Sequence, residues 1–208
     1  TGASDLLANT GGVEITLGKE MIRTPVDDAI GYIKKTVIGD VMNIKKVRVD
    51  KEGTGMGWGA VYAQYLESMD QIGEQGNGLS VSRQLYKGDE ALNESAPLKV
   101  GDKITVRLTV KADRDMDFVQ IKDDRAACME PLQAVSGFRW SNGLGYYQAT
   151  KDASTQFFID QMRKGTYVIE YQVYVNRTGE YQTGIATVQS AYAPEFGGHT
   201  GGYRVMVE

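Results

Sequence analysis

An unbroken alternation of apolar and polar side chains in residues 103–112 constrains the fold of this chain more than any other feature. The apolar positions are Ile104, Val106, Leu108 and Val110, and the polar positions between them are Thr105, Arg107, Thr109 and Lys111. Successive side chains of a strand point to opposite faces, so this pattern predicts a strand with one face on a core and one in water. Residues 165–175 repeat it, with Tyr167, Ile169, Tyr171, Val173 and Val175 on one face.

Similar segments recur along the chain. We predict strands over residues 13–17, 44–50, 58–67, 79–86, 117–122, 155–160, within 179–192 and at 203–208. Residues 30–37 fit a short helix or a strand, with Ile and Val favouring a strand, and residues 124–150 look long and irregular. Short strands at intervals of about 8–12 residues, without helical periodicity between them, predict an all-β antiparallel sandwich. The 25 glycines and 12 tyrosines agree with a turn-rich β-protein.

A glycine-rich segment, residues 73–78 (GEQGNG), is the best candidate for a linker between two domains. Residues 79–208 hold about seven predicted strands, enough for a complete sandwich. Residues 10–72 hold three or four, few for an independent sandwich. Leu6 and Leu7 before a glycine pair look like the end of a helix. We therefore expect a remnant of a preceding helical domain at 1–12, a partial β-domain at 13–75 and a sandwich at 76–208.

Charge and composition argue against several functional classes. The net charge is −4, which gives no electrostatic reason to expect a nucleic acid or an anionic membrane surface as partner. No run reaches the roughly 18 apolar residues that a transmembrane helix needs, so we expect no direct membrane insertion. The lone Cys128 cannot form an internal disulfide. It fits a small buried side chain better than a thiolate activated by His199, the only histidine.

Clustered acids offer two further candidate sites. Asp113, Asp115 and Asp117 alternate along one segment, so they fit either a calcium site or a solvated strand end paired with nearby bases. Asp123 and Glu130 could form a glycosidase pair, although nothing in the sequence fixes their separation. No GxSxG, P-loop, HExxH or CxxC motif occurs, and we expect neither enzymatic activity nor a cofactor.

Aromatic residues leave a choice between core packing and a surface that stacks on sugars. The residues concerned are Trp58, Tyr62, Tyr65, Trp140, Tyr146 and Tyr147. Core and turn packing is favoured for most of them. Exposed, coplanar rings would favour a carbohydrate- or ligand-binding surface module, whereas burial of Trp140, Tyr146 and Tyr147 would argue against it.

Two long segments resemble a known family. The stretch from LKVGDKITVRLTVKA to KGTYVIEYQVYVNRTG and AYAPEFGGHTGG is similar to the terminal macroglobulin-type domain of bacterial alpha-2-macroglobulins, in a form like that of Bacteroides-type bacteria. The stretch from VEITLGKEMIRT to GWGAVYAQYLESMD resembles the strands of the CUB-like β-domain that follow the helical thioester domain. The resemblance implies a macroglobulin- or immunoglobulin-like sandwich preceded by a partial CUB-like domain.

The resemblance also implies a function. Members of this family are extracytoplasmic bait-and-trap protease inhibitors, so we expect a non-catalytic C-terminal segment of such an inhibitor, in a periplasmic or cell-envelope parent that is a lipoprotein. Cys128 lacks the Glu-Gln that follows the cysteine of the family's thioester motif. In thioester-bearing relatives a Met-Tyr pair of the last domain shields the thioester. Tyr192 matches this tyrosine, whereas Ala191 replaces the methionine. The expected partners are the helical thioester domain of the same parent and, through the parent, proteases.

Overall fold

The computed structural model of the chain describes residues 12–23, 34–39, 44–53, 55, 57, 59–62, 64–93 and 96–208. The chain divides into two compact units, Thr1–Gln64 and Tyr65–Glu208. Within the described ranges there is no α-helix, and no helix is long and apolar enough to span a bilayer. The strands pair antiparallel throughout, so the predicted all-β antiparallel class is confirmed.

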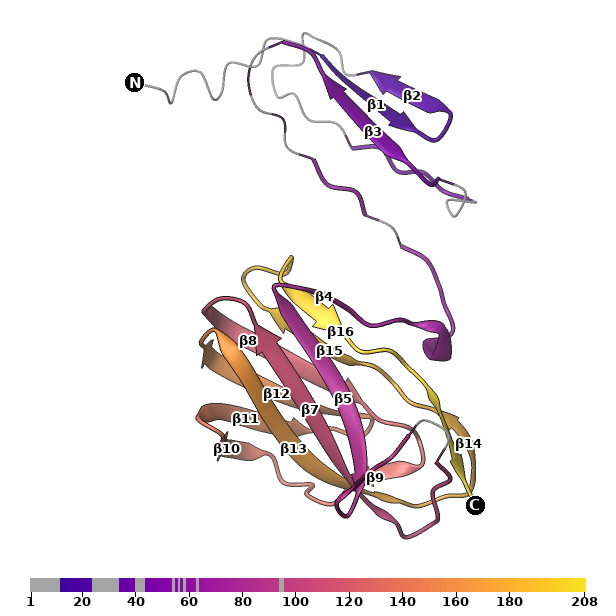
Figure 1. The fold of residues 1–208 in the computed structure, drawn as a ribbon, viewed down its shortest axis with the longest axis vertical. Helices are drawn as coiled ribbons and strands as arrows, with labels where there is room; N and C mark the ends of the chain where they lie inside the picture. Colours follow the sequence, from indigo (N-terminus) through magenta and orange to yellow (C-terminus); the bar gives the residue numbers. More distant parts are fainter. Residues whose placement is uncertain are drawn as a thin grey trace. The chain divides into compact units, whose positions relative to one another are not determined.

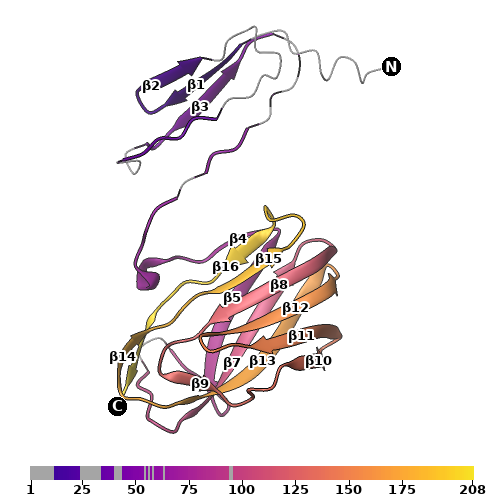
Figure 2. The same cartoon turned by 180° about the vertical axis from the view of Figure 1, so that it is seen from behind.

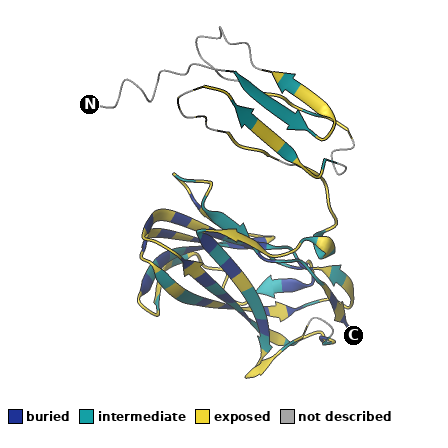
Figure 3. Ribbon diagram, turned by 45° about the horizontal axis from the view of Figure 1, so that its top comes forward, coloured by how far each residue is buried: buried dark blue, intermediate teal, exposed yellow. Residues whose placement is uncertain are grey.

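The described residues of the first unit form a three-stranded sheet with strand order β2-β1-β3. Its strands are β1 (Val13–Leu17), β2 (Glu20–Arg23) and β3 (Val47–Lys51). The predicted strands at 13–17 and 44–50 are therefore confirmed, the second with a shifted start. No described residue between 12 and 64 is buried, and Figure 3 shows these strands in teal and yellow only.

The strand predicted over residues 58–67 is wrong for the part that the structure describes, because 59–62 and 64–67 are in no strand. Tyr62 is 92% exposed and Leu66 is fully exposed, so the alternation there has no partner strand to pack on. Residues 34–37 also form no strand. Residues 1–11 with the expected helix end, residues 30–33 and Trp58 lie outside the described ranges.

The second unit contains the remaining strands and one 3₁₀ turn, η2 (Met69–Gln71). The early strands are β4 (Gln75–Asn77), β5 (Leu79–Lys87), β6 (Glu90–Ala91), β7 (Lys103–Ala112), β8 (Met116–Asp124) and β9 (Met129–Pro131). The later strands are β10 (Gly137–Ser141), β11 (Leu144–Thr150), β12 (Ser154–Met162), β13 (Gly165–Val175), β14 (Gly179–Gln182), β15 (Ala186–Ser190), β16 (Gly197–His199) and β17 (Arg204–Val207).

These strands form a sandwich of two layers (Figures 1 and 2). One layer contains β5, β7, β13 and β9, and the other contains β10, β11, β12, β8, β15 and β16. The short strand β4 pairs with both β16 and β5, so it closes one side of the sandwich. Across the layers, the ring of Phe157 on β12 lies 5.9 Å from that of Tyr171 on β13.

The core lies between the layers and follows the predicted alternation. Ile104, Val106, Leu108 and Val110 are each at most 2% exposed, and Ile169, Val173 and Val175 of β13 are also buried. Figure 3 shows the result as alternating dark and yellow bands along the strands. Burial of these aliphatic side chains is the main source of the sandwich's stability.

Two predictions for this unit are wrong. Residues 124–150, expected to be irregular, contain β9, β10 and β11. Residues 73–78, expected to be a linker, contain β4, whose residues bond main chain to main chain although all three are exposed. The limits of the family domains and the CUB-like character of the first unit stay predictions.

Glycines let the start of the second unit lie directly on its C-terminal part. A Cβ on Gly202 would lie 1.9 Å from the carbonyl oxygen of Met69, and one on Gly198 would lie 2.7 Å from that of Gln75. Real Cβ atoms do not approach so closely, so only glycine fits here without a backbone shift. Beside this contact, Arg204 of β17 forms a 2.9 Å ion pair with Asp70 of η2.

Candidate interaction site

Tyr192 lies in the loop of residues 191–196 between β15 and β16. Main-chain hydrogen bonds hold both ends of this loop, from Ser190 N to the Phe196 carbonyl oxygen at 3.0 Å and from Phe196 N to the Ala193 carbonyl oxygen at 2.9 Å. The Asn77 side-chain amide donates a further bond of 2.7 Å to the Glu195 carbonyl oxygen. Side-chain and backbone bonds together therefore fix the loop on the sandwich.

The Tyr192 side chain is presented outward from this fixed loop. It is 80% exposed, and among the described residues its ring contacts that of Phe118, whose centroid lies 5.1 Å away at an interplanar angle of 85°. That is the edge-to-face arrangement that aromatic pairs prefer. An exposed aromatic side chain on a rigid support suits a contact with another surface better than core packing.

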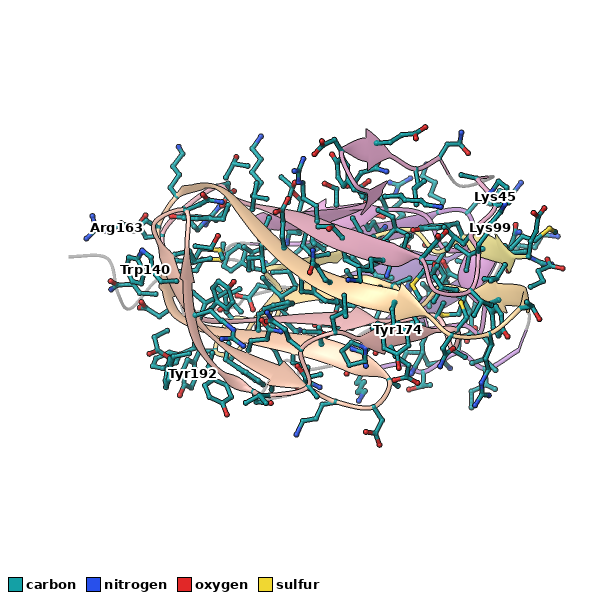
Figure 4. The ribbon with its side chains drawn as sticks, turned by 90° about the horizontal axis from the view of Figure 1, so that it is seen from below. Lys45, Lys99, Trp140, Arg163, Tyr174 and Tyr192 are labelled. Carbon is teal, nitrogen blue, oxygen red and sulfur yellow. The ribbon has the colours of Figure 1, made fainter. Side chains whose placement is uncertain are left out.

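Several hairpin turns meet at the same end of the sandwich. Arg163, in the turn between β12 and β13, and Trp140, just before the turn between β10 and β11, lie toward this end in Figure 4, whereas Lys99 lies at the other end. The Arg114 guanidinium stacks over the Phe196 ring at 4.6 Å, so the turn after β7 also supports the Tyr192 loop. Loops gathered at one end of a sandwich are a common place for contact surfaces.

Other aromatic residues are divided between surface and core. Trp140 is 78% and Phe138 80% exposed, but Tyr146 is buried and Tyr147 half-buried. The exposed ring of Phe138 and the half-buried ring of Tyr147 meet at 75° between ring planes, so these two rings do not share a plane. Of the residues whose burial would argue against a sugar-binding surface, Tyr146 is therefore buried and Trp140 is not. Tyr62 and Tyr65 are exposed, outside any strand.

The acidic segment is held by bases and backbone. Asp113 forms a 2.8 Å ion pair with Arg114, and the carboxylate of Asp115 accepts a 2.7 Å bond from Lys164 N. Asp117 is exposed on β8. Among the residues that the structure describes, no group of three or more His, Cys, Asp or Glu could hold a metal ion. The three aspartates are therefore not brought together as calcium ligands.

The residues considered for catalytic pairs lie in surroundings that do not suit catalysis. Cys128 is buried, and burial raises the pKa of its thiol, the opposite of what an activated nucleophile requires. His199 points Nδ1 at the Thr200 carbonyl oxygen, 3.2 Å away. Asp123 is buried in an ion pair with Arg83, whereas Glu130 lies on β9 near Asn176.

The ion pair of Arg83 with Asp123 is the main feature that sequence reasoning missed. Arg83 Nη1 donates to Asp123 Oδ1 at 2.7 Å, and the Tyr171 hydroxyl donates to Asp123 Oδ2 at 2.7 Å. The side chains of Arg83 and Asp123 are 5% and 1% exposed. The sequence alone could have indicated it. Arg83 lies between Val81 and Leu85 on the inward face of β5, so the alternation predicts that its side chain is buried.

This network also links the two layers. Arg83 Nη2 donates to the Thr183 hydroxyl at 3.1 Å and to the Gly184 carbonyl oxygen, which ties β5 to the segment before β15. Burial, followed by the charge and hydrogen bond of Asp123, raises the pKa of Tyr171 well above its usual value. The arrangement is structural, because Arg83, Asp123 and Tyr171 point into the core and bond to one another there.

Comparison with known proteins identifies the fold and the family. The family model for the bacterial alpha-2-macroglobulin MG10 domain matches residues 78–195. Salmonella alpha-2-macroglobulin reacted with methylamine covers 94% of this chain at a TM-score of 0.53 and 16% identity, and Escherichia coli alpha-2-macroglobulin activated by porcine elastase covers 95% at 0.57 and 13% identity. The chain spans only 13% and 18% of those two proteins.

One curated relative is a protein of Dictyostelium discoideum, whereas the structures above are of bacterial proteins. Circularly permutated Ras protein 2 of Dictyostelium discoideum is 28% identical over 166 residues, which are 76% of this chain and 4% of that protein. Because the match covers so little of that protein, it says nothing about the activity of this chain. The family model, by contrast, matches more than half of this chain. Residues 78–195 therefore place this chain in the bacterial alpha-2-macroglobulin family, as the bearer of its MG10 domain.

Proposed function

We propose that the chain is a non-catalytic C-terminal segment of an alpha-2-macroglobulin-like protease inhibitor, and that its sandwich contacts the helical domain of the same parent through Tyr192. One observation carries the proposal: Tyr192 is 80% exposed on a loop that is fixed to an MG10 domain. Escherichia coli alpha-2-macroglobulin has been solved after activation by trypsin and after activation by porcine elastase, which is consistent with a protease-responsive parent.

The physical role of such a contact is to hold a domain in place until cleavage elsewhere releases it. A rigid sandwich suits this role because its loop presents the tyrosine with little entropy left to lose on binding. An exposed aromatic ring with a hydroxyl can bury apolar area and still donate a hydrogen bond. A reactive group beneath it in the helical domain would thereby be kept from water.

The test uses the full parent protein with Tyr192→Ala, and with Tyr174→Ala as a matched control. Tyr174 is a half-exposed tyrosine of β13, remote from the Tyr192 loop (Figure 4). Hydrogen exchange of the helical domain and the stoichiometry of trypsin inhibition are measured. We expect faster exchange and weaker inhibition for Tyr192→Ala only. Equal behaviour of the two variants contradicts the contact.

The isolated chain should neither inhibit nor hydrolyse anything. It contains no Cys-x-Glu-Gln thioester motif, and its ionisable clusters are paired or buried as described above. Incubation with trypsin should leave the protease fully active on a large protein substrate. Stoichiometric inhibition by the chain alone would contradict the assignment.

A periplasmic or cell-envelope location, with the parent as a lipoprotein, belongs to the same proposal because an inhibitor must meet proteases outside the cytoplasm. Fractionation of the source cells tests it, and recovery of the parent in the cytoplasmic fraction speaks against it.

A carbohydrate-binding module is the second candidate, favoured by exposed Trp140 and Phe138. Affinity electrophoresis in polysaccharide gels, with Trp140→Ala as control, tests that alternative.

A further inference from the structure

Phe118 has an unusual backbone conformation for its residue type. Its φ is 53°, in the left-handed region that favours glycine. Among the described residues, the other non-glycine with positive φ is Asn142, which precedes Gly143 in a turn where asparagine is common. A phenylalanine in this conformation costs free energy, and such strain persists only where the surrounding structure imposes it.

Burial of the Phe118 side chain does not offset the free-energy cost of this backbone conformation. The Phe118 side chain is 50% exposed, whereas its neighbours Met116 and Val119 are buried. In the pairing of β8 with β12, Val119 pairs with Ile159 and Asp117 pairs with Gln161. Phe118, which lies between them, has no paired residue on β12. An exposed, strained aromatic residue at an irregularity of a strand is better explained by what it supports than by core packing.

What Phe118 supports is Tyr192. The Phe118 carbonyl oxygen accepts a 2.9 Å hydrogen bond from Ala191 N, the residue directly before Tyr192. The two rings then meet edge to face at 5.1 Å. Backbone and side chain of Phe118 therefore fix both the start of the loop and the direction of the tyrosine ring.

We propose that Phe118 and Tyr192, the aromatic pair, form one contact surface, in which Phe118 positions Tyr192 and supplies the apolar neighbour that Ala191 is too small to provide. This inference rests on the proposed function, since it names a second residue of the same contact. To its partner, the helical domain of the proposed function, the pair presents an apolar surface with one hydroxyl group. Within the described part of the chain, the Tyr192 hydroxyl has no hydrogen-bond partner.

The first experiment measures positioning in the chain itself. Phe118→Ala and Phe118→Gly should shift the Tyr192 ring protons toward random-coil positions in NMR spectra, because the facing ring is lost. Phe118→Tyr should keep them in place. Phe118→Gly should also melt about 2–4 °C higher than Phe118→Ala, because glycine relieves the strained φ. Unchanged Tyr192 shifts in both truncations, or equal melting temperatures of the two, would overturn the positioning role.

The second experiment measures the contact in the full parent. Both truncations should speed hydrogen exchange in the helical domain about two- to tenfold, as expected for loss of one aromatic pair. The double variant with Tyr192→Ala should add little to Tyr192→Ala alone, whereas independent residues would add fully. If Tyr192→Ala has no effect on exchange, the proposed function fails. If Tyr192→Ala acts and both Phe118 truncations do not, this inference alone fails.

Discussion

Replacing Asp123 with Asn should destabilise the sandwich by about 3–5 kcal/mol, the range for breaking one partner of a buried ion pair. The change keeps the shape of the side chain and removes only its charge. Arg83, 5% exposed, would then remain charged without a counter-ion. The new amide group would also meet or displace the Tyr171 hydroxyl, which donates to Asp123 Oδ2 at 2.7 Å. A domain of ordinary stability, about 5–15 kcal/mol, would lose a large part of it.

Urea unfolding followed by far-UV circular dichroism measures this loss, because Trp140 is exposed and reports poorly on the core. Asp160→Asn is the matched control, since Asp160 is an exposed aspartate on the neighbouring strand β12. We expect the control to stay within about 0.5 kcal/mol of the wild type. A loss below about 1 kcal/mol for Asp123→Asn would refute the view that this charge is needed to neutralise Arg83.

Three further outcomes follow from the same structure. The raised pKa of Tyr171 means that its contribution to stability is complete below about pH 10 and is lost as pH rises further, so Tyr171→Phe should flatten the fall of urea midpoints between pH 9 and 11. Gly202→Ala should cost roughly 1–3 kcal/mol in urea unfolding, because its Cβ would meet the Met69 carbonyl oxygen, whereas Gly137→Ala in open space should cost little. Cys128 should react with a thiol reagent only after unfolding, as its burial and raised pKa require, and rapid labelling of the native protein would contradict this.

The sequence was informative where side chains alternate beside a core. Strands β7 and β13 were predicted from Leu108, Ile169 and their neighbours because a period of two directly encodes the buried face. Strand β16 was missed because Gly197 and Gly198 carry no side chains that could show such a period. Its pairing is a property of the backbone and of its neighbours, which no local pattern records.

The candidate site could be predicted only in part. Tyr192 came from a family resemblance, and the structure places it on the surface. Phe118 could not be predicted, since its contact depends on pairing between β8 and β15, some 70 residues apart in sequence. Arg83 and Asp123 were predictable in principle, because both stand at inward positions of alternating strands and so require each other.

The close packing of Met69 and Gln75 on Gly202 and Gly198 has a mechanical consequence, because it attaches the start of the second unit to its C-terminal part. Strand β4 is joined to β16 by main-chain pairing, all three of its residues are exposed, and Asn77 at its end bonds to Glu195 beside Tyr192. Tension applied to the chain at Tyr65 would first load the contacts of Asp70 with Arg204 and of Ile72 with Gly202, and then this short ladder. From the ladder, the hydrogen bond between Asn77 and Glu195 would pass the tension to the loop that carries Tyr192, so a force on the start of the second unit would act on its exposed aromatic residue.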